Sequence, residues 1–232
     1  MSKKNITIAA VSDVKIRETI YALITSNACF KRSSKTLLFT SKDVALSKKE
    51  SKIIDIIKIK KINSLKGYSN FIIYSLYKYI DTSHILIVQW DGYIINPKKW
   101  DTNFLNYDYI GAPFIPRGSD PNYCRDKARG FYTIGNGGFS LRSRRLLEAP
   151  SKFKLVDNKK YTNFHEDGFF SVYHRRFLEK KGYSWAPYSI AKKFSLESPI
   201  SFRDLNTLPF GFHGKKMFYL LLFFKIVNFF KI

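Results

Sequence analysis

The chain has 232 residues, of which 45% are hydrophobic, and its 40 Lys and Arg residues against 18 Asp and Glu residues give a formal net charge of +22. This length and hydrophobic content predict one folded domain and exclude a disordered chain. Two cysteines, Cys29 and Cys124, are too few and too unpatterned for a disulfide framework or a zinc site, which favours a reducing compartment. The positive charge predicts affinity for polyanions, either nucleic acid or an anionic membrane surface.

Strands and helices are expected to alternate through the N-terminal half. The N-terminus has no apolar signal-peptide core, so export is not expected. No Gly-Lys-Ser/Thr loop or GxGxxG motif follows the first strand, which argues against P-loop and dinucleotide enzymes. The order of elements predicts an α/β domain whose N-terminal half is a nucleotide-binding βαβ unit. We expect strands at 6–11, 36–40, 56–59 and 84–89, and helices at 14–27, 47–54 and 70–80.

The strand expected at 84–89 ends beside an aspartate. Its apolar, β-branched residues are typical of a buried parallel strand, and Gln89-Trp90-Asp91-Gly92 follows directly. In open α/β sheets, ligands bind outside the carboxyl ends of the strands. Hard divalent cations prefer carboxylate oxygen. Asp91 is therefore a candidate metal ligand, and an aspartate that only caps a turn is the alternative.

Two segments further along the chain have the composition of a substrate site. Residues 135–140 read Gly-Asn-Gly-Gly-Phe-Ser, and their glycines would let the backbone approach a ligand closely. A simple tight turn explains these glycines equally well. The pair Glu166-Asp167, bracketed by apolar residues, suits a general base in a pocket wall. Of Arg142, Arg144 and Arg145, at least two are expected on a solvated helix face, although the cluster could also hold phosphate.

Taken together and in this order, these segments resemble a bacterial family of glycosyltransferases, catalogued mostly as a domain of unknown function and found among surface-polysaccharide genes. The resemblance covers residues 5–214 and implies a single GT-A-like α/β domain with a mixed central sheet over residues 1–214. It further implies a nucleotide-diphosphate sugar donor, mainly a UDP-sugar, and Mn²⁺ or Mg²⁺ as cofactor. It rests on Gln89-Trp90-Asp91, Tyr107-Asp108-Tyr109-Ile110-Gly111-Ala112-Pro113, Gly135-Asn136-Gly137-Gly138-Phe139-Ser140-Leu141-Arg142, Glu166-Asp167 and Pro209-Phe210-Gly211-Phe212-His213.

The resemblance also implies residue roles in transfer of a hexose to a saccharide or lipid-linked saccharide, as in lipopolysaccharide synthesis. Asp167 would be the general base of an inverting reaction, and Glu166 would hydrogen-bond the acceptor. Asp91 and His213 would bind the cation. Many GT-A enzymes carry Asp-x-Asp where this chain has Gln89-Trp90-Asp91, so we expect a weaker hold on the metal. The donor would be bound by Val11, Ser12 and Asp13 near the base and ribose, by Asn136, Gly137 and Gly138 around the sugar, and by Lys215 or Lys216 at the diphosphate.

The C-terminal segment, residues 215–232, is expected to form a basic, aromatic tail. Its apolar run is interrupted by Lys225 and Lys231, which makes it too short and too charged to span a bilayer. Such a segment is typical of a helix lying in the membrane interface, and a terminal helix packed on the domain is the alternative. The tail and the positive charge together predict a cytoplasmic enzyme held peripherally at the inner face of the cell membrane.

Two other function classes remain open. The charge of +22 is compatible with a nucleic-acid-binding module without catalysis, although no recognition motif is present and the Glu-Asp pair and glycine loop would be unexplained. Nucleic acid is therefore not the expected partner. The second alternative is a metal-dependent hydrolase or nucleotidyltransferase that acts on a nucleotide-sugar.

Overall fold

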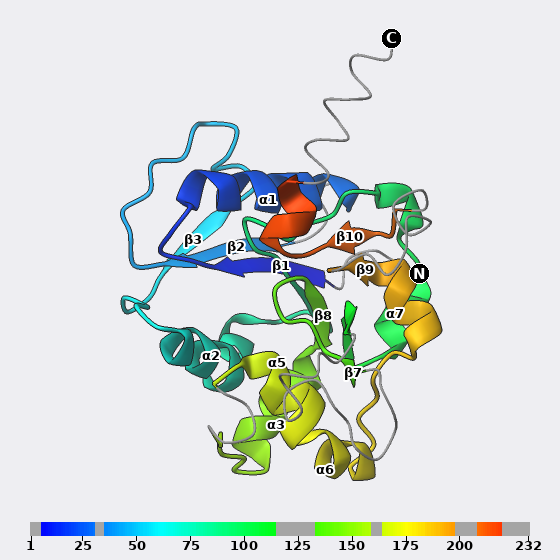
Figure 1. The fold of residues 1–232 in the computed structure, drawn as a ribbon. Coiled ribbons are helices and arrows are strands. Elements are labelled where there is room, and N and C mark those ends of the chain that lie inside the picture. The colour runs from blue at the N-terminus through cyan, green and yellow to red at the C-terminus, as the bar shows by residue number, and fades with distance from the viewer. Residues whose placement is uncertain (1–5, 31–34, 115–132, 159–163, 198–207, 220–232) are drawn as a thin grey trace.

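A mixed six-stranded sheet forms the centre of the molecule in the computed structural model, which describes residues 6–30, 35–114, 133–158, 164–197 and 208–219. The strand order is β3-β2-β1-β4-β8-β5. Helix α1 covers one face of this sheet, and α2 and α3 cover the other (Figure 1). The arrangement is a three-layer α/β domain, as the alternating sequence pattern predicts.

The N-terminal half supplies the parallel part of the sheet. Parallel pairing joins β3 to β2, β2 to β1 and β1 to β4. The crossover helices are α1 (Ile16–Cys29) and α2 (Leu65–Tyr74), and the 3₁₀ turn η1 (Leu76–Tyr79) follows α2. This half therefore has the expected βαβ organisation. The four strands are β1 (Ile6–Val11), β2 (Lys35–Thr40), β3 (Asp55–Lys58) and β4 (His84–Ile87).

The second half completes the sheet in the opposite direction. Strand β8 (Ser140–Ser143) pairs antiparallel with β4, and β5 (Tyr109–Gly111) pairs antiparallel with β8. Two small sheets, β6-β7 and β10-β9, flank it. The remaining elements are η2 (Pro97–Lys99), η3 (Thr102–Asn106), β6 (Pro113–Phe114), β7 (Thr133–Ile134), α3 (Arg144–Lys152), α5 (Glu166–Gly168), the π-helical turn η4 (Phe169–Tyr173), α6 (Arg175–Lys180), α7 (Tyr188–Phe194), β9 (Ser195–Leu196) and β10 (Gly211–Phe212).

The core lies on both faces of the sheet, because successive residues of a strand point to opposite sides. In β1, Ile8 and Ala10 join the cluster under α1, whereas Ala9 and Val11 join the cluster under α2 and α3. Strands buried on both faces read as continuous apolar runs, so the run in 84–89 correctly predicted a central strand.

The predicted helix at 47–54 is wrong, because residues 48–53 form turns. The backbone N–H of Ser47 donates to the Glu50 carboxylate, and the Glu50 N–H lies 3.3 Å from the Ser47 hydroxyl, which is the pattern of a helix-starting box. The N–H groups of Ile53 and Ile54 then both donate to the Glu50 carbonyl. Ile54 is buried and leads straight into β3, so the chain turns into the core after a single turn.

The start of the tail is packed on the domain. Residues 215–219 are helical, and Met217 is buried in a cluster with Tyr93 and Phe212. The ring of Phe218 lies 5.7 Å from that of Trp90. This first turn agrees with the packed-helix alternative. Residues 220–232 lie outside the described part of the chain, so the interfacial anchor stays a prediction.

Among the described helices, none combines the length and hydropathy that crossing a bilayer would need.

The carboxyl ends of β1 and β2 are tied together by the side chain of Asp13. Its carboxylate accepts hydrogen bonds from the Thr40 hydroxyl, the Ser41 hydroxyl, and the backbone N–H groups of Ser41 and Ile62. Burial alone would raise the pKa of Asp13, but these four hydrogen bonds outweigh it and lower the pKa to about 2. Asp13 therefore fixes the loops at the edge of the sheet where ligands are expected.

Replacing Asp13 with Asn should destabilise the fold by about 1 kcal/mol, less than the full pKa shift implies because solvent screens a half-buried carboxylate. Since the folded pKa lies below the unfolded one, this contribution is present above about pH 4 and is lost as the pH falls toward 2. Urea unfolding at neutral and acidic pH measures it. The exposed Asp55→Asn is the control. Equal effects of the two substitutions at neutral pH would contradict the role given to Asp13.

Candidate active site

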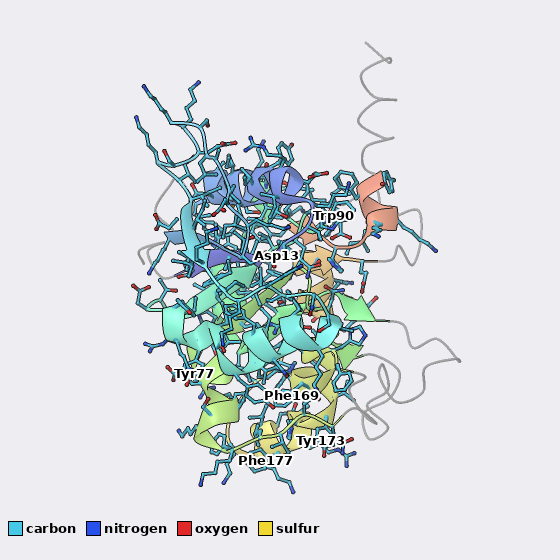
Figure 2. All side chains as sticks on the ribbon, turned by 90° about the vertical axis from the view of Figure 1, so that its left-hand side faces the viewer. Asp13, Tyr77, Trp90, Phe169, Tyr173 and Phe177 are labelled. Atoms are coloured by element: carbon cyan, nitrogen blue, oxygen red, sulfur yellow. The ribbon has the colours of Figure 1, made fainter. Side chains whose placement is uncertain are left out.

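The candidate site lies where β4 ends, and segments from four parts of the chain meet there. They are the 89–92 turn after β4, the 135–139 loop before β8, the short helix α5, and the end of β10. Figure 2 shows Trp90, within the 89–92 turn, in the same upper part of the molecule as Asp13. The side chain of Lys15, which follows Asp13 closely, lies 6.0 Å from the centre of the Trp90 ring. The ends of β1 and β4 thus border the same region.

The 89–92 turn is tight and is held to the end of β10. Gln89 and Gly92 exchange two backbone hydrogen bonds of 2.9 and 3.0 Å. The N–H of Gly214 donates to the carbonyl of Asp91 at 2.8 Å. A Cβ atom on Gly92 would lie 2.8 Å from the His213 ring, so only glycine fits there without displacing the histidine. The turn therefore brings Asp91 and His213 to one place.

His213 is the centre of a group of polar side chains. Its Nε2 atom lies 3.1 Å from Gln89 Oε1 and 3.9 Å from Asp91 Oδ1. Its Nδ1 atom lies 2.9 Å from Asn136 Nδ2 and 3.3 Å from Glu197 Oε1. Burial alone would lower the pKa of His213, but Glu197 and then Asp91 raise it above the ordinary value. Both ring nitrogens of His213 therefore have polar neighbours, which fix the orientation of the ring.

The glycine loop is shaped by Asn136. Its Oδ1 atom accepts the backbone N–H groups of Gly138 and Phe139 at 2.9 and 3.3 Å, a turn that asparagine forms readily. A Cβ on Gly138 would lie 2.0 Å from His213 Nε2, and a Cβ on Gly137 would lie within 2.1 Å of the Glu166 carboxylate. Protein side chains therefore already occupy the space that the glycines leave free. That these glycines line the donor sugar stays a prediction.

The acidic pair is docked against the back of this loop. Asp167 Oδ2 accepts the N–H of Gly137 at 3.2 Å, and its Oδ1 accepts the N–H of Gly168 at 2.8 Å. Glu166 Oε1 accepts from Arg142 Nη2 at 2.7 Å. Glu166 was predicted to hydrogen-bond the acceptor, whereas in the structure one of its carboxylate oxygens accepts a hydrogen bond from Arg142. The backbone N–H groups of Gly137 and Gly168 thus orient the Asp167 carboxylate, and its role as the base stays a prediction.

Arg142 is entirely buried and was not singled out by the sequence as a core residue. Besides Glu166, its Nε and Nη2 atoms donate to Ser140 Oγ at 3.1 Å and to the Tyr109 hydroxyl at 3.3 Å. Burial alone would lower the pKa of Arg142, but Tyr109 and then Glu166 raise it, so the guanidinium stays charged. As expected, the other two arginines of the cluster are solvated, with Arg144 paired to Glu148 and Arg145 to Asp108.

Tyr68 joins this group to helix α2 and was also missed. Its hydroxyl accepts from Gln89 Nε2 at 3.1 Å, while Gln89 Oε1 faces His213. Burial, followed by the charge of Glu166, raises the pKa of Tyr68. The Tyr68 hydroxyl therefore connects α2 to Gln89 beside His213 and lies within reach of the charges of the acidic pair.

The predicted donor-binding residues divide into two groups. The Val11 side chain packs in the core, and the Ser12 hydroxyl bonds to the backbone of Val14. The Asp13 carboxylate accepts four hydrogen bonds within the protein, so it holds together the loops at the ends of the strands. Lys215 lies 5.8 Å from the Trp90 ring, beside Asp91, and Lys216 is exposed next to it. Binding of a donor by these five residues stays a prediction.

The residues around His213 fit a divalent cation. In the described part of the chain, no group of three or more His, Cys, Asp and Glu side chains is arranged as a metal site. Asp91 Oδ1 and His213 Nε2 nevertheless lie 3.9 Å apart, which two ligand atoms at roughly 2.0–2.3 Å from one ion can span. Gln89 Oε1 adds an amide oxygen beside them. Carboxylate and carbonyl oxygens suit Mn²⁺ or Mg²⁺, and the imidazole, which is a ligand of transition metals, favours Mn²⁺ of the two.

Replacing Arg142 with Met should cost about 3–5 kcal/mol of stability, because it leaves the buried Glu166 carboxylate without its cation. Arg144→Met, which breaks an exposed pair two residues further along the chain, is the matched control and should cost less than about 1 kcal/mol. Urea unfolding of both variants measures the difference. The double variant with Glu166→Gln should recover part of the loss. Equal stabilities of the two single variants would show that the buried pair is not what holds α5 on β8.

Solved structures of similar fold are glycosyltransferases. A glycosyltransferase involved in the glycosylation of the major capsid of PBCV-1 superimposes with a TM-score of 0.51 at 14% identity, covering 91% of this chain and 93% of that chain. The galactosyltransferase LgtC, in complex with donor and acceptor sugar analogs, gives a TM-score of 0.49 at 14% identity, covering 90% of this chain and 87% of that chain. The chain has the GT-A type of α/β fold.

No curated protein matches the sequence. The pattern of one family, described as "Protein of unknown function (DUF5672)", matches residues 50–213, which is most of the chain. The chain belongs to the DUF5672 family.

Proposed function

We propose that the protein is a glycosyltransferase that moves a hexose from a nucleotide-diphosphate donor, a UDP-sugar, to an acceptor hydroxyl. The observation that carries this proposal is the convergence on Asn136 and its loop. Asn136 contacts His213 on one side, and the next residue, Gly137, holds Asp167 on the other. A candidate metal ligand and a candidate base are thereby fixed on two sides of one loop. The GT-A type of fold supports the same reading.

In this proposal Asp167 is the general base. Its two oxygens accept backbone N–H groups, which orient the carboxylate. The acceptor oxygen forms a bond to the anomeric carbon as the bond from that carbon to the diphosphate oxygen breaks. The acceptor proton passes to Asp167, and the diphosphate leaves with the bonding pair. A single displacement of this kind inverts the anomeric configuration.

Asp91 and His213 would hold a Mn²⁺ or Mg²⁺ ion, with the Gln89 amide oxygen beside them. When bound, the cation supplies positive charge to the diphosphate. Asn136 and Glu197 orient the His213 ring, as outer partners of metal-binding histidines do. Lys215 and Lys216 lie next to this turn and would add charge toward the diphosphate. Asn136, Gly137 and Gly138 would border the donor sugar.

The acceptor would be a saccharide or lipid-linked saccharide in the synthesis of a surface polysaccharide, at the inner face of the cell membrane. A hydrolase acting on the same donor would use the same base with water in place of the acceptor. Comparing sugar release with and without an acceptor distinguishes these two reactions.

Asp167→Asn should lower kcat about 10²–10⁴-fold, because the amide keeps the shape of the side chain but cannot take the acceptor proton. Donor affinity should change little, since the base acts on the acceptor. Release of the nucleoside diphosphate and calorimetric titration of UDP measure the two quantities. Asp81→Asn, at an exposed aspartate, is the control. Near-normal turnover of the Asp167 variant would refute the assignment and move attention to Glu166.

Asp91→Asn should abolish the gain in UDP affinity that Mn²⁺ provides, because it removes the candidate ligand carboxylate that lies 3.9 Å from Nε2 of His213. The gain is measured by titrating UDP with and without Mn²⁺, and metal binding itself is measured by the electron paramagnetic resonance of free Mn²⁺. Lys215→Gln should weaken UDP binding with or without the ion and so serves as a matched comparison. UDP binding that is the same with Mn²⁺ and with a chelator in the unmodified protein would contradict the metal assignment.

A further inference from the structure

A cavity of about 560 Å³ lies beside the candidate active site. It is bounded by α7, β9 and the segment that contains η2 and η3, and none of the groups assigned above to donor binding lines it. In Figure 1, α7 and β9 lie at the side of the molecule near β10 and β7. The cavity is thus a separate space that the reaction described above does not yet use.

Glu197 places the cavity next to the candidate site. Glu197 lines the cavity, and its Oε1 atom lies 3.3 Å from Nδ1 of His213. From Glu197 the wall runs back along β9 to Ser195, a distance of about 7 Å at the rise of a strand. A molecule in the cavity would therefore lie along this wall, with its Glu197 end next to His213.

The rim of the cavity is positively charged. Four exposed lysines line it, Lys98 and Lys99 from η2 and Lys192 and Lys193 from α7. Among the described residues, no carboxylate forms an ion pair with any of the four. The two acidic side chains of the wall have other partners, because Asp101 accepts the N–H of Asn103 and Glu197 contacts His213. This rim is suited to an anion.

The wall between the rim and the site is suited to a sugar. The half-buried rings of Trp100 and Tyr188 line it, and aromatic faces offer apolar area to a polyhydroxyl ring. The hydroxyl of Ser195 is buried at this wall and has no hydrogen-bond partner among the described residues. Buried polar atoms are normally paired, so an unpaired one beside a cavity favours a polar ligand.

We propose that this cavity binds the acceptor and that the acceptor is a phosphorylated saccharide. Its sugar would lie at Trp100 and Tyr188 with a hydroxyl toward Glu197 and the site, and its phosphate would lie at the four-lysine rim. Calling the ligand an acceptor rests on the proposed glycosyl transfer, but binding of the ligand does not depend on catalysis. The phosphate is either a ring substituent or the anomeric phosphate of a lipid-linked sugar.

Binding of three probes to the whole protein tests this inference. Glucose 6-phosphate carries the phosphate as a substituent, glucose 1-phosphate carries it at the anomeric carbon, and glucose carries none. At constant ionic strength, calorimetry should show that one or both phosphates bind at least tenfold more tightly than glucose. Saturating UDP should leave that binding in place, because the donor site is separate. Which phosphate binds more tightly identifies the position of the anion.

The double variant Lys192→Gln/Lys193→Gln should weaken the sugar phosphate about tenfold, since each charged contact to phosphate contributes to affinity. Lys180→Gln/Lys181→Gln, an equal change of charge at the exposed end of α6, is the matched control and should leave it unchanged. Equal weakening by both pairs, displacement by UDP, or binding of both phosphates no tighter than glucose would overturn the inference.

Asp167→Asn should keep sugar phosphate binding while losing transfer. Absence of transfer with any donor would defeat the proposed function and leave the cavity assignment standing.

Discussion

The buried ion pair between Arg142 and Glu166 is the interaction on which the candidate site depends. Arg142 belongs to β8 and Glu166 to α5, and their side chains are 0% and 5% exposed. The pair fixes the acidic helix behind the glycine loop. It also explains why residue 137 is glycine, because the Glu166 carboxylate fills the space of a side chain there. Asp167 is then brought to the loop, where its carboxylate accepts the Gly137 N–H.

Burying such a pair costs desolvation energy, so its main effect is to position α5 against β8 and not to add to the free energy of unfolding. Arg142 also contacts Ser140 and Tyr109, which places one cation at the meeting point of two strands and a helix. Tyr68 and Gln89 make polar contacts beside His213, and the charges of Glu166 and Arg142 act on the Tyr68 hydroxyl. The candidate base and the candidate metal ligands are therefore held by neighbouring groups of side chains around one loop.

The sequence predicted the strands well because their apolar runs are local signals. The strand at residues 6–11 is confirmed at both ends, and the β4 strand and its position before Asp91 follow from the same pattern. The helix at 47–54 failed because one capping pair does not outweigh burial of Ile54. Arg142 was named only as a member of an arginine cluster, and its buried pair with Glu166 was not predicted, because an arginine in a strand gives no local sign of a partner 24 residues away. The reason why residues 137 and 138 are glycines could not be predicted either, because Glu166 and His213, which fill the space of their side chains, are distant in the sequence.

The anomeric configuration of a product tests glycosyl transfer by a base at Asp167 most directly. A set of UDP-sugars would be incubated with Mn²⁺ and a saccharide acceptor, and the anomeric proton would be followed by NMR from the first turnovers. We expect a new glycosidic bond whose configuration is opposite to that of the donor, formed at the rate of UDP release. A product that keeps the donor configuration, or release of free sugar at the same rate with and without acceptor, would contradict single displacement by an Asp167-activated acceptor.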